Sequence, residues 1–371
     1  MNTNKTNTMT DTKQKTQAKR TDIARTPLAP GYTVPRVILG GWQLSKGHAL
    51  ARPLDFDAVR RAFVTMKRAG LNTFDGADIY TGVEDFYGSI VRDEAAAGES
   101  VPQVHTKFVP DLDDLAKIDA AYVEGVVTRS LKRLGVEALD LVQFHWWDYS
   151  VPGMVDVAGH LVRLKEKGLI RNIGTTNFNS TELERLLEAG IPVVSNQCQY
   201  SILDRRPERG LTELCRRYGM KLLCYGTLAG GFLSERWIGQ ERPQEIENRS
   251  LVKYDLVIRD TLGWEGFQKL LLGLKAIADE KGVTVSELAT LFMLTRPHVA
   301  AAIVGVRNDR HVAETIRTAS LSLTGEETKR IEALTADLPT LPGDAFDIER
   351  DPESAHRKIM RMNLVNSTTG F

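Results

Sequence analysis

Residues 139–177 read LDLVQFHWWDYSVPGMVDVAGHLVRLKEKGLIRNIGTTN, and this stretch decides the fold. Its first seven residues form a short apolar run that is typical of a buried strand. Residues 154–167 carry apolar side chains at helical spacing and stop at Gly168, and glycine commonly ends a helix. A second apolar run starts at Ile170. Strand, helix and strand in this order predict a βαβ unit whose two strands lie parallel.

The same unit recurs along the chain. The expected strands start at Arg36, Asn72, Val104, Leu139, Ile170, Val193, Lys221 and Ala301, and the expected helices cover residues 57–69, 83–96, 118–134, 154–167, 181–188, 208–218, 267–281 and 310–318. Most of the strands are continuous apolar runs, which is typical of parallel strands that are covered on both faces. Eight units predict an α/β protein with a single-domain (β/α)8 TIM barrel, a fold that needs about 250 residues. The other residues are expected in long active-site loops and in extra C-terminal helices, one of them at residues 285–294.

The barrel is expected to occupy residues 31–340. Residues 1–30 form a polar, weakly basic segment that we expect to be a disordered tail, because it has little apolar surface to bury. Residues 341–371 form a C-terminal extension to which the sequence assigns no role. An open, doubly wound sheet is the competing fold, but no G-x-G-x-x-G turn follows the first strand.

Composition favours small-molecule chemistry. The 48 Lys and Arg residues balance 48 Asp and Glu residues, so no net charge attracts nucleic acid or an anionic membrane. Cys198, Cys215 and Cys224 lack the close spacing of zinc ligands and are expected to be reduced, buried thiols in a cytoplasmic protein. We expect neither a membrane span nor a signal peptide, because no apolar run is long enough. The oligomeric state stays open.

Four polar side chains follow successive strands. They are Asp75, Tyr80, Lys107 and His145, and a parallel barrel brings the ends of these strands to one mouth. The set suits carbonyl reduction, because hydride arriving at a carbonyl carbon leaves negative charge on oxygen and a positioned acid must protonate it. Tyr80 is the expected donor, and Lys107 is expected to lower its pKa. Asp75 would hold the lysine, and His145 would orient the substrate oxygen. No second histidine stands at ligand spacing from His145, so a metal is not expected.

Seven segments occur in an order that resembles the aldo/keto reductase family. They are GADIYTGVEDFYG (76–88), HTKF (105–108), LVQFHWW (141–147), IGTTNF (173–178), NQCQYS (196–201), CYGTLAGGFL (224–233) and IVGVRNDRHVAET (303–315). The resemblance implies an NAD(P)H-dependent oxidoreductase that reduces an aldehyde or ketone, or oxidises the matching alcohol or sugar. It places Asp75, Tyr80, Lys107 and His145 at the family's catalytic positions.

The resemblance also implies the cofactor residues. Thr176, Asn177 and Gln197 would bind the nicotinamide carboxamide, Tyr225 would stack on the ring, Gly226, Leu228, Gly230 and Gly231 would follow the pyrophosphate, and Gly305, Arg307, Arg310, His311 and Glu314 would lie near the adenosine 2′-phosphate. NADPH is the expected cofactor and NADH the alternative, because Gly305 stands where some members have Lys and Thr315 where many have Asn. Trp42, Trp146, Trp147 and Trp237 are candidates for the substrate pocket, with ordinary packing an equal alternative.

A second class of function stays open at this point. Relatives of this fold serve as β-subunits of potassium channels, so the resemblance also allows a regulatory or scaffold subunit that binds a nicotinamide cofactor with little or no turnover. The intact set of four catalytic positions favours an enzyme whose partner is a small carbonyl or alcohol substrate.

Overall fold

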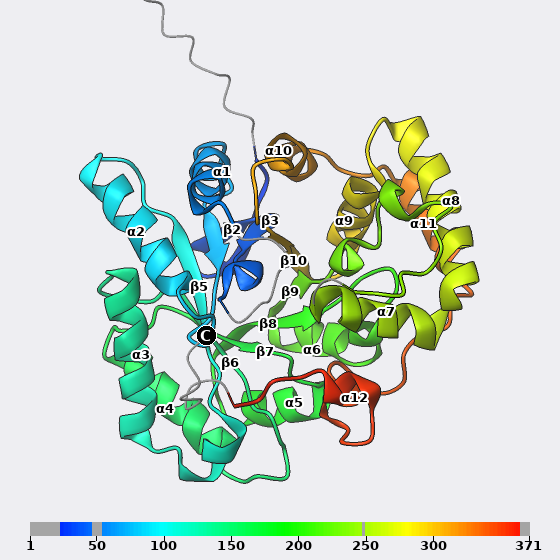
Figure 1. The fold of residues 1–371 in the computed structure, drawn as a ribbon. Coiled ribbons are helices and arrows are strands. Elements are labelled where there is room, and N and C mark those ends of the chain that lie inside the picture. Colours follow the sequence, from blue (N-terminus) through cyan, green and yellow to red (C-terminus); the bar gives the residue numbers. More distant parts are fainter. Residues whose placement is uncertain (1–22, 47–53, 247–248, 364–371) are drawn as a thin grey trace, which may run out of the picture.

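Eight parallel strands close into a barrel in the computed structural model, which describes residues 23–46, 54–246 and 249–363 (Figure 1). The strands are β3 (Val37–Gly40), β4 (Thr73–Asp75), β5 (Gln103–Phe108), β6 (Leu141–Phe144), β7 (Ile173–Thr176), β8 (Val193–Gln199), β9 (Lys221–Tyr225) and β10 (Val299–Gly305). Each strand pairs with the next along the chain, and β10 pairs with β3 to close the ring. The predicted (β/α)8 barrel is confirmed.

Helices coat the outside of the barrel (Figure 1). They are α1 (Phe56–Arg68), α2 (Val83–Ala96), α3 (Ala120–Leu134), α4 (Met154–Glu166), α5 (Ser180–Glu188), α6 (Leu211–Tyr218), α8 (Gly263–Lys281) and α10 (Val312–Ser320). Their apolar faces pack on the strands, as where the Phe63 ring of α1 meets the Phe74 ring of β4 edge to face with centroids 4.9 Å apart. Helix α3 ends at Gly135, which adopts the left-handed conformation at φ 69°.

A hairpin closes the N-terminal end of the barrel, and it corrects one prediction. Strands β1 (Arg25–Ala29) and β2 (Tyr32–Pro35) pair antiparallel, and Leu28 and Val34 pack against Ile38 and Leu141 inside the barrel. The disordered tail predicted for residues 1–30 is therefore wrong for residues 25–30, while residues 1–22 lie outside the described residues. The five residues of β1 include one large apolar side chain, so only the barrel interior reveals what they bury against.

Further helices lie beyond the eight units. They are α7 (Arg249–Thr261), α9 (Val285–Thr295), α11 (Gly325–Thr335), α12 (Asp347–Arg350) and α13 (Ala355–Lys358), with short 3-10 turns η1 (Trp42–Leu44), η2 (Leu112–Lys117), η3 (Arg206–Arg209), η4 (Ala229–Gly231) and η5 (Glu235–Trp237). Helix α9 matches the helix expected at residues 285–294, whereas α7 lies where a long loop was expected. None of the helices in the described part of the chain is long and apolar enough to cross a membrane.

The C-terminal extension runs across the mouth of the barrel. Arg350 on α12 donates hydrogen bonds to the backbone oxygens of Trp146 and Asn177, which follow β6 and β7. Further on, the backbone oxygen of Met362 accepts from the Leu112 amide, beyond β5. Figure 1 shows this red segment passing from α12 over the strand ends. The extension therefore forms part of the wall around whatever binds at that end.

Candidate active site

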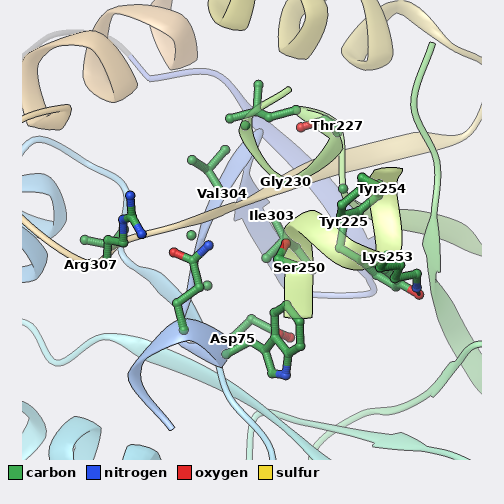
Figure 2. A pocket seen from close by; sticks show the side chains of 18 of the residues that line it. Asp75, Tyr225, Thr227, Gly230, Ser250, Lys253, Tyr254, Ile303, Val304 and Arg307 are labelled. Carbon is green, nitrogen blue, oxygen red and sulfur yellow. Dashed lines mark hydrogen bonds between the residues drawn. The ribbon is translucent and has the colours of Figure 1, made fainter. Parts of the chain in front are cut away.

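A cavity of about 750 Å³ opens at the C-terminal ends of the strands (Figure 2). Its lining includes Tyr80, Lys107 and His145 from the ends of β4, β5 and β6, and Tyr225 and Arg307 from the ends of β9 and β10. These residues follow different strands, and parallel pairing brings them to one face. A long cavity of this kind has room for an extended cofactor with a small substrate at its inner end.

Three of the four predicted catalytic side chains form one contact network. Lys107 Nζ donates hydrogen bonds of 2.7 Å to Asp75 Oδ1 and to the Gly76 backbone oxygen. The same ammonium lies 5.0 Å from the centroid of the Tyr80 ring and interacts with its hydroxyl. Asp75 and Lys107 are both buried, so their ion pair is shielded from water.

The pKa of Tyr80 differs from the expectation. Burial raises it above the ordinary value of 10.0, and the nearby Lys107 ammonium lowers it by less than that. For Lys107, burial lowers the pKa, but the Asp75 carboxylate and the Tyr80 hydroxyl together outweigh this and the net shift is upward. Lys107 thus lowers the pKa of the phenol, as expected, but burial outweighs this contribution in the free protein. The phenol keeps its proton and the amine keeps its charge at neutral pH.

His145 is held as a neutral ring in a defined tautomer. Its Nδ1 lies 2.9 Å from the Thr176 backbone oxygen, and a carbonyl oxygen only accepts, so Nδ1 carries the hydrogen. Burial, followed by the charge of Arg350, lowers its pKa to about 3. Nε2 is buried, has no hydrogen-bond partner among the described residues and belongs to a side chain that lines the cavity. It is therefore a hydrogen-bond acceptor available to a bound molecule.

Gln143 is a member of this network that the sequence analysis did not identify. Its Nε2 donates to Asp75 Oδ2 at 3.0 Å, while Gln197 Nε2 donates to the same oxygen at 2.7 Å and to Gln143 Oε1 at 2.8 Å. Gln143 stands inside the apolar run LVQFH, where it reads as one polar residue in a strand. The sequence did contain an indication of this role. Gln143 lies two residues before His145, so the two side chains lie on the same face of the strand.

The predicted nicotinamide residues also line the cavity. Thr176, Asn177, Gln197 and Tyr225 all contribute to its wall. The Tyr225 hydroxyl donates to Asn177 Oδ1 at 2.8 Å, and Asn177 adopts a positive φ of 61°. A positive φ is uncommon outside glycine, although asparagine adopts it more readily than most residues.

The loop after β9 needs glycine for two reasons. Gly226, Leu228, Gly230 and Gly231 line the cavity as predicted. At Gly226, with φ 76°, an added Cβ would lie 2.0 Å from the Tyr254 hydroxyl, so the loop packs tightly on α7. At Gly231, with φ 103°, a Cβ would meet nothing within 4 Å. This glycine leaves open space through which a ligand can approach the backbone.

Most of the predicted phosphate-binding residues line the cavity around the start of α10. Gly305, Arg307, His311 and Glu314 line it. Glu314 accepts hydrogen bonds from His311 Nδ1 at 2.8 Å and from Thr284 Oγ1 at 2.7 Å. Arg310 is exposed and is not part of the cavity wall, so its contact with the cofactor stays a prediction. The turn before α10 directs Arg307, and not Arg310, to the cavity.

Three of the four candidate tryptophans line the cavity. Trp42, Trp147 and Trp237 belong to its wall, and the Trp147 ring stands edge-on to His145 with centroids 4.2 Å apart. Trp146 is completely buried in the core against Phe144, so its predicted role in the substrate pocket is wrong. Two adjacent residues at a strand end point to opposite sides, and only one of them reaches the cavity.

The C-terminal extension adds residues that no strand-end pattern could indicate. The Phe346 ring lies 5.8 Å from the His145 ring, centroid to centroid, and both side chains line the cavity. Ile359, Met360 and Arg361 line it as well. The extension thus shapes the end of the cavity that holds Tyr80 and His145.

Comparison with known proteins assigns the chain to a family. Residues 36–336 match the model of the aldo/keto reductase family, and the chain belongs to this family, as its motifs predicted. It is an oxidoreductase of the class that acts on carbonyl compounds or alcohols, and the family typically uses NAD(P)H.

Individual relatives are distant. Pyridoxal reductase, chloroplastic, of Arabidopsis thaliana is 26% identical over 298 residues, covering 76% of this chain and 78% of the relative. Flagellar radial spoke protein 5 of Chlamydomonas reinhardtii is 29% identical over 253 residues, covering 57% of this chain and 47% of the relative. The solved structure of glycerol dehydrogenase from Gluconobacter oxydans matches with a TM-score of 0.70 at 24% identity, over 88% of this chain and 98% of that one. That structure supports the barrel fold.

Proposed function

We propose that this protein is an NADPH-dependent carbonyl reductase in which Tyr80 donates the proton. The observation that carries the proposal is the network of Tyr80, Lys107 and Asp75 beside the acceptor nitrogen of His145, all at one end of a long cavity. The cavity also fits the cofactor, because the Gly231 backbone is open to it and the buried Thr227 hydroxyl that lines it has no partner among the described residues.

Each of these side chains has a separate role in the reaction. The cofactor supplies hydride to the carbonyl carbon when it is bound. Tyr80 Oη gives its proton to the carbonyl oxygen, and the Lys107 ammonium, held by Asp75, stabilises the phenolate that remains. His145 Nε2 accepts a hydrogen bond from the hydroxyl group of the alcohol product, or from a hydroxyl next to the substrate carbonyl.

NADPH is preferred over NADH in this proposal. Arg307 lines the cavity just before α10, and it forms no ion pair with a carboxylate of the described residues, so its guanidinium is available to a phosphate. The N-terminus of α10 adds a favourable dipole. We place the reaction in the cytoplasm, in keeping with three cysteines that are free and buried.

The substrate is a small carbonyl compound or alcohol. Two relatives are named for such substrates, pyridoxal for one and glycerol for the other. Trp147 and Phe346 flank His145 with aromatic surface, which favours a substrate with a flat or apolar body beside the reacting group.

A scaffold role is the second candidate, and one relative favours it. Flagellar radial spoke protein 5 is named as a component of a structural assembly, although it matches this chain over less than half of its own length. A scaffold subunit would bind NADPH without turning over any carbonyl compound. Retention of Asp75, Tyr80 and Lys107 in one network, with His145 lining the same cavity, favours the enzyme.

The deciding experiment incubates purified protein with NADPH and a panel of aldehydes and ketones. We expect loss of NADPH absorbance with several of them, at a rate proportional to protein concentration. The same protein should bind NADPH more tightly than NADH, as measured by quenching of tryptophan fluorescence. Tight NADPH binding with no turnover of any compound would reject the reductase and support the scaffold.

Replacing Gln143 with Leu should lower kcat about tenfold. The substitution removes one hydrogen bond from Asp75 and one from Gln197, and a lost hydrogen bond to a charged group costs about 1.5–3 kcal/mol. NADPH should also bind more weakly, because Gln197 loses its support.

Steady-state kinetics and the melting temperature test this role together. Asn196→Leu is the matched control, since it removes a buried amide of β8 that bonds Thr175 and Phe178 instead of Asp75. It should lower the melting temperature with a smaller effect on kcat. A folded Gln143→Leu protein with kcat within twofold of the wild type would show that Gln143 has no positioning role.

A further inference from the structure

Helix α7 places a lysine beside Tyr225, the residue that is expected to stack on the nicotinamide ring. Lys253 is 8% exposed, and its Nζ lies 3.5 Å from the Tyr225 hydroxyl and 5.1 Å from the centroid of the Tyr225 ring. Figure 2 shows Lys253 next to Tyr225 on the wall that α7 forms. Lys253 lines the cavity, but it belongs neither to the catalytic network nor to the positions expected to hold the cofactor.

The Tyr225 ring is held in place next to this charge. Its hydroxyl donates to Asn177 Oδ1 at 2.8 Å, and an ammonium can only donate, so the hydroxyl oxygen is the acceptor for Lys253. Strand β9, which ends at Tyr225, pairs with a strand on each side, so the backbone is also fixed. Any ring that stacks on Tyr225 therefore lies at a limited distance from the ammonium.

The positive charge of Lys253 is only partly balanced. Its carboxylate partner is Glu349, whose Oε1 lies 3.7 Å from Nζ and which also accepts hydrogen bonds of 2.9 and 3.1 Å from Arg206. Burial lowers the pKa of Lys253, and the Glu349 carboxylate does not restore it. The charge of this ammonium is thus less favourable here than in water, and a second positive charge nearby would be unfavourable as well.

The two forms of a nicotinamide cofactor differ in charge at the ring that would stack on Tyr225. The reduced ring is neutral, whereas the oxidised ring carries one positive charge. Stacked rings have centroids about 4.5–7 Å apart, so a ring on Tyr225 would lie within about 12 Å of the Lys253 ammonium. At about 12 Å and an effective dielectric constant of about 20, the repulsion of two unit charges changes a binding equilibrium about tenfold.

We infer that Lys253 selects the redox state of the cofactor, because its ammonium disfavours the oxidised nicotinamide ring on Tyr225 and leaves the neutral reduced ring nearly unaffected. The inference rests on the proposed function, and it adds a direction to it. In a mixture of the two forms the site would be occupied mainly by NADPH, and it would release NADP⁺ readily after hydride transfer. Such a site suits a protein that works as a reductase rather than as an alcohol dehydrogenase.

The test measures the Kd of NADPH and the Kd of NADP⁺ by calorimetry, with no carbonyl compound or alcohol present. Lys253→Met keeps the apolar part of the side chain and removes the charge. We expect the ratio of the NADP⁺ Kd to the NADPH Kd to fall about tenfold, mainly because NADP⁺ binds more tightly. Lys253→Arg keeps the charge and should keep the ratio within about twofold of the wild type. Lys253→Gln replaces the Met variant if thermal melting shows that the latter does not fold.

Lys67→Met is the matched control. Lys67 is also buried and also pairs with a glutamate, Glu94, but it lies on α1 and does not line the cavity. Its replacement should lower the melting temperature and leave the ratio of the two dissociation constants unchanged. If Lys67→Met lowers the ratio as much as Lys253→Met does, the effect does not come from a charge beside Tyr225 and the inference is refuted.

Three further outcomes have distinct meanings. Equal weakening of both cofactor forms in Lys253→Met, with an unchanged ratio, would overturn the inference, since Lys253 would then only hold Tyr225 in place. A ratio that falls in Lys253→Arg as much as in Lys253→Met would overturn it too, because charge would not be the cause. A ratio that depends on Lys253 as expected, in a protein that reduces no carbonyl compound, would sustain the inference while rejecting the reductase.

Discussion

Replacing Tyr80 with Phe should reduce kcat by about a thousandfold and leave NADPH binding nearly unchanged. The ring that packs beside Lys107 is kept, and only the hydroxyl that gives its proton is lost. A positioned general acid contributes about 10²–10⁴-fold to a reaction of this kind, so water cannot replace it at a comparable rate. Single-turnover reduction of a carbonyl compound, together with fluorescence titration of NADPH, measures the two quantities separately.

The control for this experiment is Tyr200→Phe. Tyr200 is also buried, and its hydroxyl donates to Glu208 Oε1 at 2.7 Å, away from the cavity. It should lose some stability and keep most of its turnover. If Tyr80→Phe keeps more than a tenth of wild-type kcat, the proton comes from another group and the assignment of Tyr80 fails.

The barrel could be predicted because each of its strands carries its own signal. A run such as LVQFH is apolar enough to be buried on both faces wherever it pairs, and Gly135 or Gly168 marks the end of the neighbouring helix locally. The grouping of Asp75 with Lys107 follows from the same parallel order. Hairpin strand β1 carries no such signal, because Leu28 becomes a core residue only when the barrel supplies its partners.

The sequence could not predict whether a given side chain near the cavity points into it or away from it. Trp146 and Trp147 are chemically alike, yet one fills the core and the other borders the cavity. Likewise, Arg307 lines the cavity, whereas Arg310, three residues further along the same turn, does not. Residues of the extension, such as Phe346, line the cavity although they are far in sequence from the strands that form it. The spacing of apolar residues along the chain predicts helices and strands, but it does not predict such long-range contacts.

A buried ion network fastens the extension to the barrel, and breaking it should have the largest effect on stability. Arg206 is 1% exposed and bonds two carboxylates, Asp204 through Oδ1 and Oδ2 and Glu349 through Oε1 and Oε2. Arg206→Met would leave both carboxylates buried without this partner. Removing one member of such a network costs about 3–5 kcal/mol, so we expect the free energy of unfolding to fall by that amount.

The pH dependence of this loss of unfolding free energy shows whether charge or packing causes it. Burial raises the pKa of Glu349, but Arg206 and Lys253 outweigh it and bring the pKa to about 2. A carboxyl group with a lowered folded pKa stabilises the protein above its unfolded pKa, about 4.3, and this contribution is lost as the pH falls toward 2. The gap between wild type and Arg206→Met should therefore be widest near neutral pH and narrow below about pH 4.

Urea unfolding at several pH values measures this gap. Arg216→Met is the control, because Arg216 pairs with Glu213 at the exposed surface, where ion pairs contribute little. A gap that stays constant from neutral to acid pH would show that Arg206 stabilises the protein by packing alone. A gap that narrows would show that charge holds the extension, and with it Phe346, against the mouth of the barrel.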